Sequence, residues 1–296
     1  MVALAGLAAV ALVAASCARG AEEPPRATPS PAESPSPTTT PEETTTVTLY
    51  YLVDSEGRLW LAPERHEVPT QPRIGRAALE ELIAGTPQDP DHVTPIPADT
   101  EVLDLTIENG VAMVDWSAEV LEASVGSEGE ALGIQSVVWT LTEFPTVDRV
   151  RFTVEGKAEG TASNGRRIED WWGHVGLDDQ PFRRAKAIEV LEPITIWTPI
   201  DGDTVEPTFV VEGEASTFEA NVPVRIFDAE GVLVQTEVTT ATEGGPGRGT
   251  FRLEITIDDP PTSPETWRLE AFEENQETGE DFFVESREIE LGTGLR

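Results

Sequence analysis

The stretch EVLDLTIENGVAMVDW, residues 101–116, decides the fold of the first half of the chain. Two runs of alternating apolar residues flank Asn109 and Gly110, a pair that accepts the positive φ angles of a tight hairpin turn. We therefore predict two antiparallel strands that meet at this turn.

Upstream of the hairpin, residues 47–53 (VTLYYLV) and 58–62 (RLWLA) have the composition of strands and are separated by the turn DSEG. Residues 72–87 (PRIGRAALEELIAGTP) place Ile74, Ala77, Ala78 and Leu82 at helical spacing and end on Gly85 and Pro87, which stop a helix. This segment therefore predicts a helix that follows the two strands.

Downstream of the hairpin, a second helix is predicted over about 130–143, followed by a strand at 148–154 (DRVRFTV). Its apolar face comprises Ala131, Ile134, Val138 and Leu141. Strands and helices mixed in this order predict an α+β domain over residues 47–185, with the helices packed on one sheet.

Five separated motifs of this region follow, in order, the pattern of the GerMN domain of sporulation and spore germination. They are LAPERHEVP (61–69), ALEELIAGTP (78–87), IPADTEVLDLTIENGVAMVDWS (96–117), QSVVWTLTEFPTVDRVRFTVEGK (135–157) and WWGHVGLDDQPFRR (171–184). The resemblance implies a small α+β fold like the ring-building motifs of sporulation and secretion assemblies. It also implies contact with other envelope proteins and supplies no catalytic residues.

From residue 190 to 292 the pattern changes to strands alone. Seven short apolar-rich runs lie at 194–197, 208–215, 222–228, 232–239, 249–257, 266–274 and 281–291. Such spacing predicts a β-sandwich, here without the cysteine pair of disulfide-bonded immunoglobulin domains. The stretch GEASTFEANV (213–222) resembles the immunoglobulin-like domain of bacterial spore germination.

The N-terminus has the features of an exported lipoprotein. Residues 1–16 are uncharged and too short to span a bilayer, so we predict a signal peptide. The small residues before Cys17, the only cysteine, resemble a bacterial lipobox, although no Lys or Arg precedes the apolar run. We expect Cys17 to be acylated and residues 17–46, rich in Pro, Ser and Thr, to form a disordered tether.

The charge balance excludes one large class of partners. The chain has 55 acidic and 20 basic residues, a formal net charge of −35. A surface this negative repels phosphates, so we expect no nucleic-acid partner. A single cysteine also excludes an internal disulfide and a cysteine-rich metal site.

One local group of basic and aromatic residues is a candidate interaction patch, because Arg and Trp often anchor interfaces. Its members are Arg166, Arg167, Trp171, Trp172, Phe182, Arg183 and Arg184. The alternative is that the tryptophans pack on the sheet while the arginines balance nearby carboxylates. Of the two interpretations we favour the second, and the patch stays a candidate.

Few residues suggest chemistry. His66 with Glu64 and Glu67 resembles a metal-ligating group, but alternating residues on a strand edge are more often solvated. Ser117 directly follows a strand, where a helix N-cap is a better interpretation than an activated nucleophile. We therefore expect no catalytic residue, no metal and no cofactor; a hydrolase would need Ser117 or His174.

These observations predict a lipid-anchored, non-enzymatic protein of the extracytoplasmic face of the cell membrane. We expect it to act as an assembly, accessory or interaction module for envelope proteins, in a family linked to sporulation and germination. Two alternatives stay open: a module that binds cell-wall glycan or peptide through Trp171 and Trp172, and a modulator of a membrane sensor.

Overall fold

The computed structural model describes residues 43–123, 125–172, 176–275 and 277–294. Glu42–Arg296 forms one compact unit. The predicted signal peptide, Cys17, most of the predicted tether and His174 lie outside the described residues. Within the described ranges, no helix has the length and apolar character needed to cross a membrane.

The first half of the unit has the mixed α+β composition expected from its sequence. In chain order its elements are β1 (Thr44–Ser55), β2 (Arg58–Pro69), α1 (Ile74–Ala84), β3 (Val102–Glu108), β4 (Val111–Trp116), the 3-10 helix η1 (Ala118–Glu122), α2 (Gly126–Thr142), β5 (Arg149–Val154) and the short α3 (Ala187–Val190).

The hairpin predicted at Asn109 and Gly110 is confirmed. β3 and β4 pair antiparallel, and both turn residues have positive φ, 52° at Asn109 and 77° at Gly110. β5 then joins β4 in parallel, which completes the three-stranded sheet β3-β4-β5.

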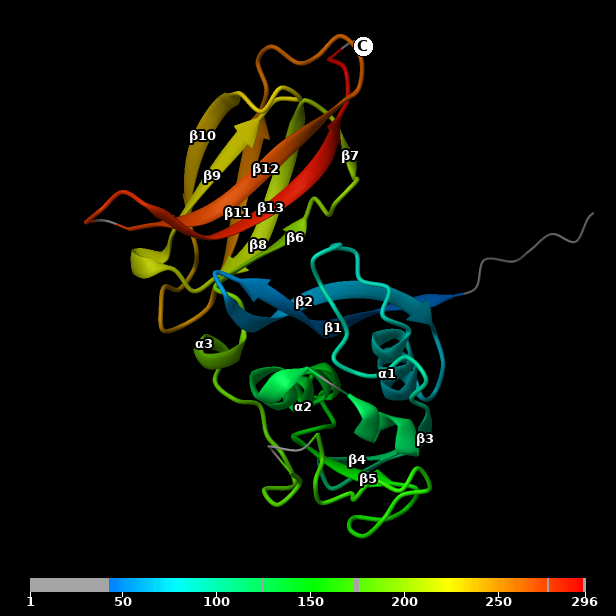
Figure 1. The fold of residues 1–296 in the computed structure, drawn as a ribbon. Helices are drawn as coiled ribbons and strands as arrows, with labels where there is room; N and C mark the ends of the chain where they lie inside the picture. The colour runs from blue at the N-terminus through cyan, green and yellow to red at the C-terminus, as the bar shows by residue number, and fades with distance from the viewer. Residues whose placement is uncertain (1–42, 124, 173–175, 276, 295–296) are drawn as a thin grey trace, which may run out of the picture. The chain divides into compact units, whose positions relative to one another are not determined.

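The prediction of one sheet for this half is wrong. β1 and β2 form a separate two-stranded sheet, and α1 and α2 lie between it and the β3-β4-β5 sheet (Figure 1). Helices with a sheet on each side bury more than one face, so a single-sheet layout could not cover them.

The single apolar face predicted for α2 is also wrong. Ala131, assigned to that face, is exposed, whereas Leu132 and Trp139 are buried in a second cluster with Tyr50. Ile134, Val138 and Leu141 pack in the main core as expected. A helix buried on two sides shows little amphipathic periodicity.

The second half is a β-sandwich, and each of the seven predicted runs forms a strand. The elements are β6 (Ile194–Thr198), β7 (Thr204–Val205), β8 (Thr208–Ala215), the 3-10 helix η2 (Phe218–Ala220), β9 (Asn221–Phe227), β10 (Leu233–Thr240), β11 (Gly249–Thr256), β12 (Glu265–Glu274) and β13 (Asp281–Leu291). The two-residue β7 was not predicted.

The sandwich consists of a five-stranded sheet, β10-β9-β12-β13-β7, and a three-stranded sheet, β11-β8-β6 (Figure 1). Inward residues such as Val211, Val224, Leu269 and Ile289 alternate with outward ones and are fully buried between the sheets. This alternation is the sequence signal from which the sandwich was predicted.

Candidate functional site

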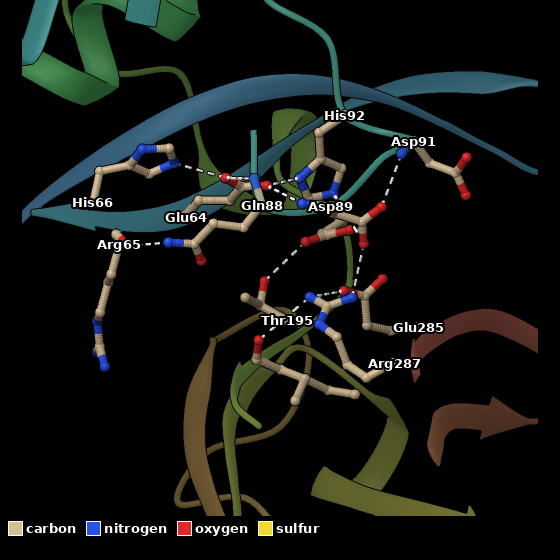
Figure 2. A network of polar contacts seen from close by, with 12 residues as sticks. Glu64, Arg65, His66, Gln88, Asp89, Asp91, His92, Thr195, Glu285 and Arg287 are labelled. Carbon is tan, nitrogen blue, oxygen red and sulfur yellow. Dashed lines mark hydrogen bonds and ion pairs between the residues drawn. The ribbon is translucent and has the colours of Figure 1, made fainter. Parts of the chain in front are cut away.

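A buried polar network centred on Glu64 lies beside β2 (Figure 2). The Glu64 carboxylate is 5% exposed and sits next to the two imidazoles of His66 (Nε2, 2.8 Å) and His92 (Nδ1, 2.6 Å). The backbone N–H groups of Gln88 and Asp89 donate to it at 2.7 and 3.0 Å. Four donors therefore satisfy one buried carboxylate.

These donors determine the charge of Glu64. Burial alone raises the pKa of a carboxyl group, but the hydrogen bonds from His66, His92 and the two backbone amides outweigh it. They lower the pKa of Glu64 from 4.5 to about 2. Glu64 is consequently ionised throughout the physiological range.

The two histidines compensate this buried negative charge. His66 also approaches Glu81 through its Nδ1 at 3.1 Å, so both of its ring nitrogens face carboxylates. A neutral imidazole has only one N–H, so this arrangement favours the imidazolium. Burial opposes the positive charge, but the Glu64 and Glu81 carboxylates prevail and raise the pKa of His66. The pKa of His92 is raised as well, with burial outweighed by the hydrogen bond to Glu64 and by nearby Glu192 and Asp89.

Arg287 brings β13 of the sandwich into the same network. Its side chain, 6% exposed, donates from Nη1 to Asp89 Oδ2 at 2.9 Å. It also pairs with Glu285 at 2.5 Å and donates to the carbonyl oxygen of Ile196 at 3.4 Å. Asp89 lies in the loop that follows α1, so this ion pair joins the α+β module to the sandwich.

A second cation supports the segment that connects the modules. The Arg248 guanidinium donates to the carbonyl oxygen of Glu192 at 2.6 Å, to Thr195 Oγ1 at 2.5 Å and to Glu214 at 3.1 Å. The buried Glu192 carboxyl accepts from Thr195 Oγ1 at 3.1 Å. Burial and the charge of nearby Glu285 raise the pKa of Glu192.

The network thus holds charged groups in closed, mutually satisfied contacts. His66 and His92 are 6% and 3% exposed, and their hydrogen-bonding nitrogens face carboxylates rather than solvent. Within the ranges that the structure describes, no group of three or more His, Cys, Asp or Glu side chains is arranged to hold a metal ion. The arrangement is suited to a structural role, in which buried polar contacts stabilise the interface between the two modules.

The solvated strand edge expected at His66 and Glu64 is therefore wrong. Both side chains are buried because the loop after α1 folds over β2 and supplies Gln88, Asp89 and His92. Glu67 does lie on the exposed side, where Thr46 Oγ1 donates to it.

Sequence reasoning missed His92, Asp89 and Arg287. A signal existed for Arg287, because strand alternation places it on the same face as Ile289, which is buried. A charged residue at an inward position of a sandwich strand requires a partner, but its identity depends on a loop about 200 positions away.

The tryptophans of the candidate interaction patch are core residues. Trp171 is 1% exposed and stacks on Phe152, with ring centroids 5.3 Å apart and planes 11° apart. Trp172 is 6% exposed, and its indole N–H donates to the carbonyl oxygen of Val120 at 2.5 Å. Neither ring is available as a surface anchor, because both belong to the main hydrophobic core of this half.

The remaining members of the patch lie in different environments. Arg184 donates to Thr142 and Glu143 and lies 4.2 Å from the ring centroid of Trp139, while Phe182 is half-buried against the core. Arg166, Arg167 and Arg183 are exposed. A docking role for these arginines stays a prediction.

Ser117 occupies the N-cap position of η1, as predicted, but makes no side-chain cap hydrogen bond. Its Oγ instead accepts from the backbone N–H of Glu101 at 2.9 Å. This contact ties the residues before β3 to the end of β4.

Comparison with known families assigns both halves of the unit. Residues 48–160 match the family of sporulation and spore germination domains, and residues 193–280 match the immunoglobulin-like domain of bacterial spore germination. The chain is thus a two-module protein with a GerMN domain followed by an immunoglobulin-like domain of the spore-germination type, which confirms both resemblances.

Two curated relatives are similar to parts of the chain. The spore germination protein GerM of Bacillus subtilis (strain 168) is 28% identical over 187 residues, which cover 61% of this chain and 46% of GerM. The lipoprotein LpqB of Cutibacterium acnes is 30% identical over 113 residues, which cover 38% of this chain and 19% of LpqB. The chain therefore spans less than half the length of either relative.

Solved structures of GerM are also similar to this chain. The tandem GerMN domains of Bacillus subtilis GerM align with a TM-score of 0.39 and 23% identity, over 50% of each chain. The first GerMN domain of GerM aligns with a TM-score of 0.35 and 30% identity, over 43% of this chain and 96% of that one.

Proposed function

We propose that this protein is a lipid-anchored, non-enzymatic accessory protein of the cell envelope that presents two interaction modules as one unit. The observation that carries the proposal is the buried ion pair between Arg287 and Asp89 at 2.9 Å, together with the network around Glu64. Such a junction holds the two modules in a constant relation when they meet other envelope proteins.

The positions of the polar residues support a non-enzymatic role. His66 and His92 are committed to Glu64, and Ser117 accepts from the backbone of Glu101. General-base catalysis needs a group within reach of a substrate, and the imidazoles of His66 and His92 are enclosed by protein.

The envelope location rests on the lipobox-like sequence at Cys17 and on the names of the relatives, one a lipoprotein and one a spore germination protein. One lipid chain binds a membrane only marginally, whereas two chains anchor a protein stably, and a diacylated cysteine carries two. Regulation of a membrane sensor is a narrower form of the same role. Binding of the cell wall through Trp171 and Trp172 is disfavoured, because both side chains are buried in the core.

The test compares the full chain with its Cys17→Ser variant in the native cell. We expect the wild-type protein in the membrane fraction and Cys17→Ser in the soluble fraction, since the variant lacks the acylated thiol. Ser16→Ala, which keeps the cysteine and a small residue before it, is the matched control and should stay with the membrane.

Chemical crosslinking of intact cells then addresses the partners. We expect the wild-type protein to form specific crosslinks with other envelope proteins, identified by mass spectrometry. Retention of Cys17→Ser in the membrane would contradict the anchor, and an absence of crosslinks to any envelope protein would contradict the accessory role.

A further inference from the structure

Strand β10 directs its apolar side chains outward and its polar side chains toward the core, the opposite of the usual arrangement in a β-sandwich. It lies at the edge of the five-stranded sheet and pairs with β9 alone (Figure 1). Val238 is 60% exposed, Leu233 49% and Val234 42%. An edge strand of a sandwich normally directs such residues inward, against the core.

The register with β9 shows which face these residues occupy. Leu233 pairs with Phe227 and Gln235 with Ile226, so Val234 is an extra residue in the strand. Leu233 lies on the outer face because it pairs with Phe227. Val234 lies there too, because side chains alternate along the strand and Val238, four positions on, points outward. The bulge therefore places two consecutive apolar residues on the same face. Val238 lies opposite Pro223, so the apolar surface continues onto β9.

The inner face of β10 carries the polar residues. Gln235, Glu237 and Thr239 lie opposite the buried Ile226, Val224 and Val222. If β10 were shifted by one residue relative to β9, Val234 and Val238 would face the core, but the observed register leaves both exposed to solvent. The bulge therefore creates an apolar stripe on the outside of the molecule, along the edge of a sheet.

This edge has only part of the usual protection against pairing. Natural edge strands are protected by Lys, Pro, bulges or inward charges, or they are covered. Strand β10 has a bulge at Val234 and one inward charge, Glu237, but residues 232–240 contain no Lys and no Pro. Near its end β10 turns toward β11, where Thr239 Oγ1 donates to the carbonyl oxygen of Arg252 at 3.1 Å, so the open part is 233–238.

We propose that β10 pairs with β10 of a second copy of this chain, antiparallel about a twofold axis at Thr236, to form one continuous sheet. In this register Val234 lies opposite Val238 of the partner subunit, and Thr236 opposite Thr236 of the partner subunit. Both pairings, valine with valine and threonine with threonine, are favourable across strands.

The same register matches the inner face. Glu237 lies opposite Gln235 of the partner subunit, so each carboxylate meets an amide that can donate to it and the two Glu237 side chains are offset. Opposed like charges would destabilise the pair. A second copy therefore satisfies both faces of the strand at once, as an isologous interface requires.

The net charge of the chain makes the proposed dimerisation depend on the salt concentration. Each chain carries a net charge of −35, so two copies repel one another outside the nearly neutral strand. Salt screens that repulsion, and the Debye length is only about 8 Å at 0.15 M. Dimerisation should therefore strengthen as the salt concentration rises.

The test in intact cells is a disulfide at the twofold axis. Opposed residues of an antiparallel pair have Cα atoms roughly 4.5–5.5 Å apart, within the range for a disulfide. Thr236→Cys, expressed as the full chain and mildly oxidised, should give a covalent homodimer. Thr256→Cys, also exposed and on the edge strand β11 of the other sheet, is the control and should not give one.

Sedimentation of the full chain carrying Cys17→Ser gives an independent measure. Val238→Lys should weaken dimerisation roughly tenfold or more, because it sets ammonium groups among valines at the shared edge. Val93→Lys, at a valine that is 54% exposed outside the sandwich, should have no effect. Circular dichroism should show an unchanged fold in both variants.

Two results would overturn the proposal. One is a monomer at every salt and protein concentration, with no more covalent dimer from Thr236→Cys than from Thr256→Cys. The other is a Thr236→Cys crosslink to a different protein in place of a second copy, which would assign the edge to that protein.

Discussion

At the scale of single residues, Glu64 shows how a buried charge is tolerated. An isolated carboxylate in a protein interior pays a large desolvation cost, and paired hydrogen bonds can offset it. Glu64 receives two imidazole and two backbone hydrogen bonds. Its histidine partners make the network sensitive to pH.

The free energy of unfolding should fall as the pH rises above about 6.5. The folded-state pKa values of His66 and His92 are raised above 6.5, so their contribution is fully present below that value. It is lost as the pH rises through the raised values. Glu64 acts in the opposite sense, but its contribution is complete above 4.5 and is lost only as the pH falls toward about 2.

Urea unfolding between pH 5 and pH 9 measures this dependence. The double variant His66→Gln/His92→Gln should flatten the decline above pH 6.5. Glu67→Gln, at the exposed neighbour on β2, should leave it as in the wild type. A stability that rises from pH 6.5 to 8 would show that the histidines are not protonated in the folded state.

At the scale of elements, α2 depends on a glycine in its interior. A Cβ added at Gly133 would lie 2.3 Å from Cζ3 of Trp172 and 3.1 Å from Cβ of Pro95. Trp172 is itself fixed by its hydrogen bond to Val120. The close approach of helix and indole therefore requires a residue without a side chain at this position.

Gly133→Ala should destabilise the protein by about 1–3 kcal/mol, the usual cost of overpacking a core. In an exposed helix the same change would stabilise by about 1 kcal/mol, so the sign itself tests the packing. Thermal and urea unfolding give the difference.

Ser127→Ala, an exposed substitution in the first turn of α2, is the control and should change the stability by about 0.5 kcal/mol or less. In a Trp172→Leu background, Gly133→Ala should cost less, because the overlapping ring is gone. If Gly133→Ala lowered the free energy of unfolding equally in the wild type and in Trp172→Leu, its effect would not come from overlap with the Trp172 ring.

At the scale of the whole molecule, the two modules form one compact unit through contacts of several kinds. Arg287 pairs with Asp89, and the Arg65 guanidinium lies 4.2 Å from the ring centroid of Trp197. The backbone N–H of Phe283 donates to Glu56 at 3.0 Å. Polar contacts, ion pairs and ring packing thus link both halves.

Arg287→Met should destabilise the unit by about 3–5 kcal/mol, because it leaves the carboxylates of Asp89 and Glu285, each only 13% exposed, without their cation. We also expect the modules to unfold in two separate steps, visible by calorimetry, once this tie is lost. Wild-type protein should unfold in a single step.

Arg268→Met is the matched control. Arg268 pairs with Glu270, but its side chain is 46% exposed, so its loss should cost about 1 kcal/mol or less. If both variants cost the same, the Arg287 network contributes no more to stability than a surface ion pair.

The sequence by itself determined the local elements. The turn at Asn109 and Gly110, the helix ended by Gly85 and the seven sandwich strands depend on residues close together in the chain. Hydrophobic period, φ preference and helix stop signals act over that short range. The family resemblance of both modules followed from the same local motifs.

Only the tertiary structure decided which side chains are buried and with what partners. Glu64 and His66 alternate along a strand like surface residues, but a loop and β13 cover them. Trp171 and Trp172 resemble surface anchors but close a core. Burial depends on contacts between segments far apart in the chain, and these set both the cost of a charge and the pKa of each group.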